Sequence, residues 1–132
     1  MRPPPERDYR EAIELRLALR RFLRRSERIA RAHGLTPQRY QLLLFIKAAD
    51  GAATVAGLTD SLQLGQAAVT QLVRRAENLG LVHRRLSEAD ARVRLLRLTD
   101  EGERRLAGAV AELSEDRAAL IDALAQLTHE AD

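Results

Sequence analysis

The chain has 132 residues, a length typical of one domain with a single hydrophobic core. It contains no cysteine and no apolar run near the roughly 18 residues of a membrane helix, so we expect no disulfide, no thiolate metal site and no membrane partner. Its opening, MRPPPERDYR, lacks the apolar segment of a secretory signal, which favours a cytoplasmic location. The formal net charge is only +3.

The charges are distributed unevenly along the chain. Residues 1–31 carry a net charge of +5, residues 32–63 are neutral, residues 64–99 carry +4, and residues 100–132 carry −6. A local basic region matters more than the net charge for binding an anionic partner. The block at 64–99 is therefore the better candidate for such contact. We interpret the arginines of residues 1–31 as a solvated face, salt-bridged to the acidic C-terminal block.

The first two predicted elements are helices. Apolar side chains recur at steps of three and four over residues 6–32 and predict one long helix. Its stripe consists of Ala12, Leu15, Leu19, Phe22, Ser26 and Ile29. Gly34 is suited to end this helix. Thr36 is a predicted N-cap and Pro37 suits the first helical position, so a second helix begins there and ends at Asp50-Gly51.

Two short helices follow, at residues 54–62 and 66–79, and QLG separates them. The second has Val69, Leu72, Val73 and Ala76 directed inward, and Gly80 ends it. Two short helices with so brief a connection are typical of a helix-turn-helix unit, whose second helix enters the major groove of DNA.

The remaining elements are a hairpin and two helices. LVHRRL and RVRLLRLT read as strands that flank a loop, SEADA. Thr99 is a predicted cap for a further helix, and a final helix covers residues 115–127. The sequence thus predicts a mainly α fold with a small β-hairpin wing, a winged helix-turn-helix with helices added at both ends, in one domain of residues 1–132.

The outward face of the predicted recognition helix supplies the first candidate DNA contacts. They are Gln66, Ala67, Thr70, Gln71, Arg74 and Arg75. Glutamine can pair with adenine, and threonine or alanine can contact a thymine methyl group. The two arginines lie late in the helix and suit phosphate contact. Scaffolding roles remain open for Gln71 and Arg75.

The hairpin supplies the second set of candidates. On the second strand, Arg92 and Arg94 lie on one side near the tip, where Arg92 can enter an A·T-rich minor groove and Arg94 can contact phosphate. Asp90 could hold an arginine through a bidentate pair. Arg84 is either a phosphate anchor or the partner of Asp90. The alternative is a solvated hairpin whose charges prevent edge pairing.

No constellation in the sequence indicates an enzyme. His33, His83 and His129 are far apart and have no second ligand at helical spacing, so we expect no metal site. There is also no phosphate-binding glycine loop and no nucleophile with its base. We expect neither catalysis nor a cofactor.

Several segments together resemble the MarR family (multiple antibiotic resistance regulator) of bacterial transcription factors. VTQLVRRAENLGLVHRR follows the family pattern from Val69 to Arg84. DAR at residues 90–92 matches the wing signature D-x-R, and LTDEG at residues 98–102 matches L-T-x-x-G. LTPQRYQLL resembles the opening of the family's second helix. The similarity covers nearly the whole chain.

The resemblance implies a homodimeric, sequence-specific DNA-binding regulator. Residues 6–32 and 100–132 would form the dimerisation helices, and residues 36–99 the DNA-binding lobe that recognises a pseudo-palindromic double-stranded operator. The implied role is a repressor relieved by a small-molecule effector bound between these two parts. Candidate walls, which could equally be core, are Leu15, Leu19, Tyr40, Leu44 and Phe45. The alternative is a winged-helix protein-interaction module without DNA binding.

Overall fold

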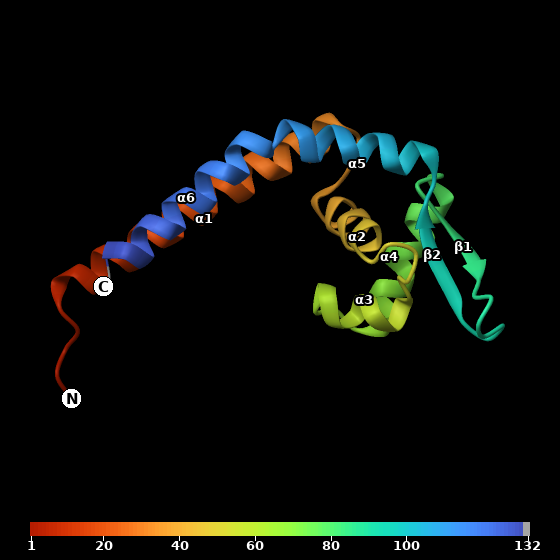
Figure 1. Ribbon diagram of the computed structural model, residues 1–132, viewed down its shortest axis with the longest axis horizontal. Coiled ribbons are helices and arrows are strands. Elements are labelled where there is room, and N and C mark those ends of the chain that lie inside the picture. The colour runs from red at the N-terminus through yellow and green to blue at the C-terminus, as the bar shows by residue number, and fades with distance from the viewer. Residues whose placement is uncertain (131–132) are drawn as a thin grey trace.

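A computed structural model describes residues 1–130 and shows a mainly helical chain with one two-stranded antiparallel sheet. The elements in chain order are α1 (Glu6–Ala32), α2 (Pro37–Ala48), α3 (Val55–Leu62), α4 (Gln66–Asn78), β1 (Val82–Leu86), β2 (Arg94–Leu98), α5 (Asp100–Glu112) and α6 (Ser114–Glu130). In Figure 1, α2, α3, α4 and the two strands form a lobe, while α1 and α6 lie side by side as a long arm. α5 connects the lobe to the arm. The predicted winged helix-turn-helix with terminal helices is confirmed.

Three threonines begin helices of the lobe or its junction. The hydroxyl of Thr36 accepts a hydrogen bond from the backbone N–H of Arg39 at 3.2 Å, and Pro37 occupies the first helical position. Thr54 and Thr99 cap α3 and α5 in the same way. Each hydroxyl satisfies one of the amide groups that a helix leaves unpaired at its start. The predicted caps at Thr36 and Thr99 are confirmed.

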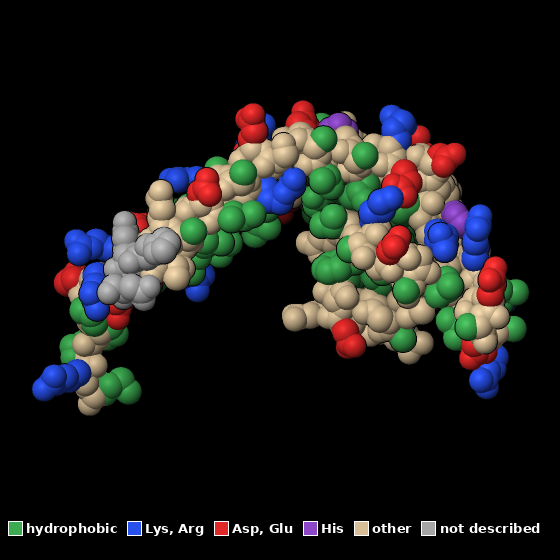
Figure 2. Space-filling view, viewed as in Figure 1, with side chains coloured by type: hydrophobic (Ala, Val, Ile, Leu, Met, Phe, Trp, Pro, Cys, Tyr) green, Lys and Arg blue, Asp and Glu red, His purple; other side chains and the backbone are tan. Residues whose placement is uncertain are grey.

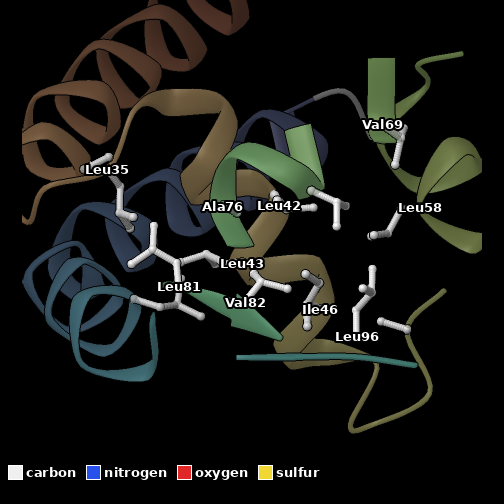
Figure 3. Close-up of a cluster of buried hydrophobic side chains, with 14 residues drawn as sticks. Leu35, Leu42, Leu43, Ile46, Leu58, Val69, Ala76, Leu81, Val82 and Leu96 are labelled. Atoms are coloured by element: carbon white, nitrogen blue, oxygen red, sulfur yellow. The ribbon is translucent and has the colours of Figure 1, made fainter. Parts of the chain in front are cut away.

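The lobe encloses one hydrophobic core, in which α2 is central (Figure 3). Leu42 and Leu43 of α2 have no exposed surface, and neither do Val69 and Val73 of α4. The core also receives side chains from α3, both strands, α5 and the connections that precede α2, α3 and β1; these are Leu35, Ala53, Leu58, Leu81, Val82, Leu96 and Leu106. Because every element of the lobe contributes, the recognition helix and the wing are held in a fixed relation.

The wing is shorter than the sequence predicts. β1 and β2 pair from Val82 with Leu98 to Leu86 with Arg94, and residues 87–93 form the connection. The hydrogen bond from Ser87 N–H to the carbonyl of Val93, at 3.0 Å, closes that connection. Arg92 therefore lies in the connecting turn and not on the second strand as predicted. The hydrogen bonds within the turn are the reason: the N–H of Val93 donates to the Asp90 carbonyl and the N–H of Arg92 to the Asp90 carboxylate, both at 3.0 Å, so neither bonds across the ladder.

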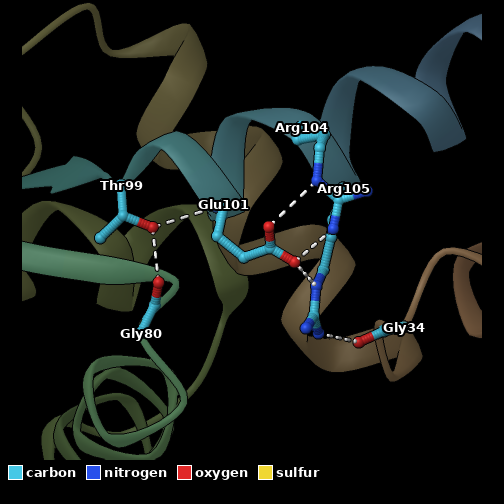
Figure 4. A network of polar contacts seen from close by, with 7 residues as sticks. Gly34, Gly80, Thr99, Glu101, Arg104 and Arg105 are labelled. Carbon is cyan, nitrogen blue, oxygen red and sulfur yellow. Dashed lines mark hydrogen bonds and ion pairs between the residues drawn. The ribbon is translucent and has the colours of Figure 1, made fainter.

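The start of α5 is fastened to the turn between the recognition helix and β1 (Figure 4). Thr99 donates its hydroxyl to the carbonyl of Gly80 at 2.6 Å, and its backbone N–H to the carbonyl of Leu81 at 3.0 Å. The buried Gly102 lies directly against the Leu81 carbonyl, so that a Cβ at this position would collide with backbone. These contacts explain why a threonine and a glycine occupy their positions in the L-T-x-x-G motif.

The arm leaves much of its apolar surface uncovered. Only Ile29 and Ala30, at the C-terminal end of α1, are buried, whereas Leu15, Leu19 and Leu23 are exposed. Of the expected ion pairs between the first helix and the acidic C-terminal block, the described residues show Arg25–Asp116 at 3.4 Å. No helix among the described residues has the length and apolarity needed to cross a membrane.

Candidate nucleic-acid interface

α3 and α4 are joined by a tight turn of residues 63–65. Gln63 takes the left-handed conformation with φ of +53°, and the N–H of Leu64 donates to the carbonyl of Thr59 at 3.2 Å. Reversing the chain in so few residues requires this conformation, which glutamine rarely adopts. The turn fixes the angle at which α4 leaves α3 and so determines which face of α4 is presented to solvent.

α4 presents the predicted polar face. Val69, Val73 and Ala76 are buried, and Ala67, Gln71 and Arg74 lie on the opposite side at helical spacing. Gln66 and Arg75 are also exposed, while Thr70 is half-buried at the margin. The exposed Ala68 was missed; it lies between the exposed Ala67 and the buried Val69, and no polar side chain indicated it. The structure thus leaves all six candidates accessible, and their contact with DNA remains a prediction.

The first turn of α4 has free amide groups. Its N-cap is Gly65, which provides no side-chain hydrogen bond, and a Cβ at Gly65 would meet no atom within 4 Å. Unpaired N–H groups at a helix start attract anions such as phosphate. Gly65 was not among the predicted site residues. Its signal in the sequence is a glycine directly before the recognition helix.

The tip of the wing holds one arginine in a defined position. The Asp90 carboxylate accepts hydrogen bonds from the Arg92 backbone N–H at 3.0 Å, from its Nε at 3.2 Å and from its Nη2 at 3.4 Å. These bonds, the backbone one first, lower the pKa of Asp90. The Arg92 side chain nevertheless remains 91% exposed. The guanidinium is therefore oriented by the protein and still accessible to a ligand.

Arg84 does not pair with Asp90, because Arg84 lies in the middle of β1, opposite Leu96, and Asp90 lies in the turn at the tip. Its Nε donates instead to Glu77 Oε1 at 2.9 Å, joining β1 to the last turns of α4. One of its two predicted roles is therefore wrong, and phosphate contact remains a prediction. Arg94 is exposed opposite Leu86, at the end of the ladder nearest the tip. Figure 2 shows arginine side chains along the wing and at its tip.

A cavity of about 640 Å³ lies between the arm and α2. Two of the five residues predicted as effector walls, Tyr40 and Leu44, line it, together with Phe22, Leu23, Ser26, Glu27, Pro37, Gln41, Val110, Arg117, Leu120 and Ile121. Leu15 lies instead in a separate hollow near the far end of the arm, and Leu19 and Phe45 do not line the cavity. Burial raises the pKa of Tyr40, an effect that nearby Arg117 partly offsets. We call this space the effector cavity, after the role predicted from the sequence for Tyr40 and Leu44.

The described residues contain no group of three or more His, Cys, Asp or Glu side chains arranged to hold a metal ion. His33 contacts Glu112 at 3.1 Å, which joins the end of α1 to the end of α5. His83 lies in β1, paired with Arg97. The side chain of His129 lies outside the described part of the chain.

Comparisons with known proteins agree with this geometry. The family model described as MarR family matches residues 33–93, which run from the end of α1 to the turn at the tip of the wing. The HTH-type transcriptional regulator YdgJ of Bacillus subtilis is 31% identical over 106 residues, which cover 71% of this chain and 64% of YdgJ. The chain thus spans less than two thirds of that relative's length.

Solved structures share the fold. A MarR family protein from Bacillus stearothermophilus is 27% identical, with a TM-score of 0.75 over 90% of this chain and 83% of that one. A mutant MarR from E. coli, complexed with operator DNA, gives a TM-score of 0.70 at 20% identity over 86% and 85% of the two chains. With the sequence motifs, the matched lobe and the shared arrangement of arm and wing, the chain belongs to the MarR family of winged helix-turn-helix transcriptional regulators.

Proposed function

We propose that this protein is a sequence-specific, cytoplasmic DNA-binding regulator, most simply a repressor, and not an enzyme. The observation that carries the proposal is the Arg92 guanidinium at the wing tip, oriented by Asp90 and 91% exposed. Holding a charged side chain in one rotamer costs conformational entropy. A side chain that is held in this way and still exposed is preorganised to contact a separate partner molecule. An A·T-rich minor groove, where the potential is most negative, is such a partner.

The recognition helix supports the same role. Ala67, Gln71 and Arg74 form an exposed strip on α4, and the Arg84–Glu77 pair fixes the wing beside that helix. Residues of this strip can read base edges in the major groove while Arg92 enters the adjacent minor groove. A relative of the same fold, MarR from E. coli, has been crystallised with operator DNA.

The uncovered arm supports binding as a homodimer. Leu15, Leu19 and Leu23 form a stripe along α1, here called the arm stripe, and each is more than a third exposed. A contiguous apolar surface of this kind marks a protein interface. A second copy that covers the arm stripe would bring two recognition helices to a pseudo-palindromic operator.

The effector cavity provides a place for regulation. It combines apolar walls with a few polar groups, among them the Tyr40 hydroxyl and the Arg117 guanidinium, as ligand sites do. It lies where the arm meets α2, so a bound molecule would contact both parts. We propose that such a molecule relieves repression by changing the angle between them.

The test is fluorescence anisotropy of the labelled intergenic DNA upstream of the protein's own gene, over a salt series. The binding constant should fall steeply as salt is added, and log K plotted against log salt should have a slope of about −0.9 for each phosphate contact. Arg92→Ala should lower the affinity by roughly 10- to 100-fold. Arg7→Ala removes the same charge from an exposed position on the arm and is the matched control, with a change below about twofold. If the affinity changed neither with the salt concentration nor with the Arg92→Ala substitution, the result would contradict the proposal and favour the protein-interaction module.

A further inference from the structure

A groove of about 500 Å³ runs between α1 and α6, next to the effector cavity, with which it shares Phe22 and Leu120. One wall carries four arginines, Arg21, Arg24, Arg25 and Arg28, which define what we call the arginine groove. Their spacing of three, four and seven residues places them on one face of α1. Leu23, which lines the effector cavity, lies about 200° around the helix from Arg25.

The arginine groove carries an excess of positive charge. Its lining includes one carboxylate, that of Asp116, which pairs with Arg25 at 3.4 Å. Among the described residues, no carboxylate lies within 4 Å of the guanidinium groups of Arg21, Arg24 and Arg28. Like charges at these helical spacings repel one another and destabilise the helix. A bound anion would relieve that repulsion, and Arg24 and Arg28 are free to contact it.

The floor of the groove is apolar. Ala18 and Phe22 of α1 face Ala119, Leu120 and Ala123 of α6 across it. Small alanine side chains leave room for a hydrocarbon to lie between the two helices, where it would be removed from water. An inorganic anion would contact only the arginines of the wall, and a neutral hydrocarbon would contact only the apolar side chains of the floor.

We propose that the arginine groove binds a free amphipathic anion, a single hydrocarbon chain that ends in a phosphate or carboxylate group. The guanidinium groups of Arg24 and Arg28 hold the anionic group, which planar guanidinium donors match in geometry. The chain lies on the floor formed by Ala119 and Ala123. The site lies on the arm, apart from the recognition helix and the wing, and it shares Phe22 and Leu120 with the effector cavity.

A dimer leaves this site open. The arm stripe lies on the side of α1 opposite the four arginines, because Leu19 and Leu23 each precede an arginine of the groove by two residues. A second copy seated on the arm stripe therefore leaves the four arginines uncovered. We expect the ligand to bind the assembled protein.

The experiment is isothermal titration calorimetry of the full-length protein with octyl phosphate below its micelle concentration. Octyl phosphate should bind at least tenfold more tightly than inorganic phosphate or octanol, which each carry half of the ligand. The double variant Arg24→Gln/Arg28→Gln should weaken binding at least tenfold, and Ala123→Leu, which fills the floor, should do the same. Circular dichroism spectra check that both variants remain helical.

Arg10→Gln is the matched control, because Arg10 lies on the same face of α1 but outside the groove, and its affinity should change less than twofold. Binding that survives both groove variants would place the amphiphile elsewhere and overturn the proposal. Equal affinity for octyl phosphate and inorganic phosphate would also overturn it. Association with phosphatidylglycerol vesicles without binding of octyl phosphate would identify a membrane surface as the ligand and would likewise reject the proposal.

Discussion

The lobe and the arm cover their apolar side chains to different degrees. In the lobe, Leu42, Leu43 and Val73 have no exposed surface, and every element contributes to one core. In the arm, α1 and α6 pack along a single seam, and Leu23 of α1 remains 55% exposed. Both regions show the same helical periodicity in the sequence. Periodicity therefore identifies an apolar face, but it does not reveal whether the same chain or a second copy covers that face.

The largest effect is expected for a cavity in the lobe. Leu43→Ala should lower the free energy of unfolding by about 3 kcal/mol, because a buried leucine loses its packing and the surroundings relax only in part. Urea unfolding followed by circular dichroism measures this change. Leu79→Ala, at a lobe position that is 51% exposed, is the control and should stay within about 0.5 kcal/mol. Equal effects of the two variants would contradict a closed core in the lobe.

A charge in the arm should affect assembly instead of folding. Leu23→Asp should raise the dissociation constant of the dimer more than tenfold, because the interface would have to bury an unpaired carboxylate. Sedimentation equilibrium measures the constant, and circular dichroism checks that helix content is retained. Leu79→Asp places the same charge on a similarly exposed leucine of the lobe and should leave the dimer intact. If the wild-type protein sedimented as a monomer, the exposed leucines of the arm would not form a dimer interface, and the contrast between lobe and arm would fail.

The junction between the two regions should show an intermediate effect. Thr99→Ala removes the cap of α5 and also the 2.6 Å hydrogen bond to Gly80, so we expect a loss of somewhat more than about 1 kcal/mol. Thr54→Ala removes a cap of the same type on α3, without such a second bond, and should cost less. Thermal unfolding of both variants ranks them. The reverse order would show that the Gly80 contact adds nothing to stability.

The smallest effect concerns pH. Hydrogen bonds from Arg104, and then from Arg105, lower the pKa of Glu101 from 4.5 to about 2. The ionised carboxylate therefore stabilises the fold above pH 4.5, and this contribution is lost as the pH falls toward 2. Glu101→Gln should show a shallower loss of stability over that interval in urea titrations at several pH values. Parallel curves for the two proteins would show that the ion pairs are too exposed to matter.

Much of the fold could be predicted from local signals. The first helix was expected at residues 6–32 and is observed at Glu6–Ala32, because its prolines and glycine mark both ends. Thr36 and Thr99 act where a capping hydroxyl was expected. The wing was less predictable. Arg92 fits a continuing strand by alternation, and only the hydrogen bonds within the turn place it outside the ladder.

The site residues that lie on a single element could be predicted from the sequence. The exposed face of α4 follows from its own periodicity, and the six candidates are all accessible. The partner of Arg84 was not predictable, because Glu77 and Asp90 lie at similar separations along the chain and only the fold distinguishes them. The effector cavity was the least predictable feature. Its walls come from α1, α2, α5 and α6, and no local pattern shows where four helices meet.

The attachment of α5 has a mechanical consequence. Thr99 and Gly102 join its first turn to Gly80 and Leu81, while Arg105 donates to the carbonyl of Gly34 at 2.9 Å and so ties α5 to the loop that leads into α2. With 13 residues, α5 is a rod about 20 Å long. A rotation of about 5° at its arm end would displace the wing by about 2 Å, close to the tolerance of a base contact. A slight reorientation of the arm would therefore move the recognition helix and the wing together.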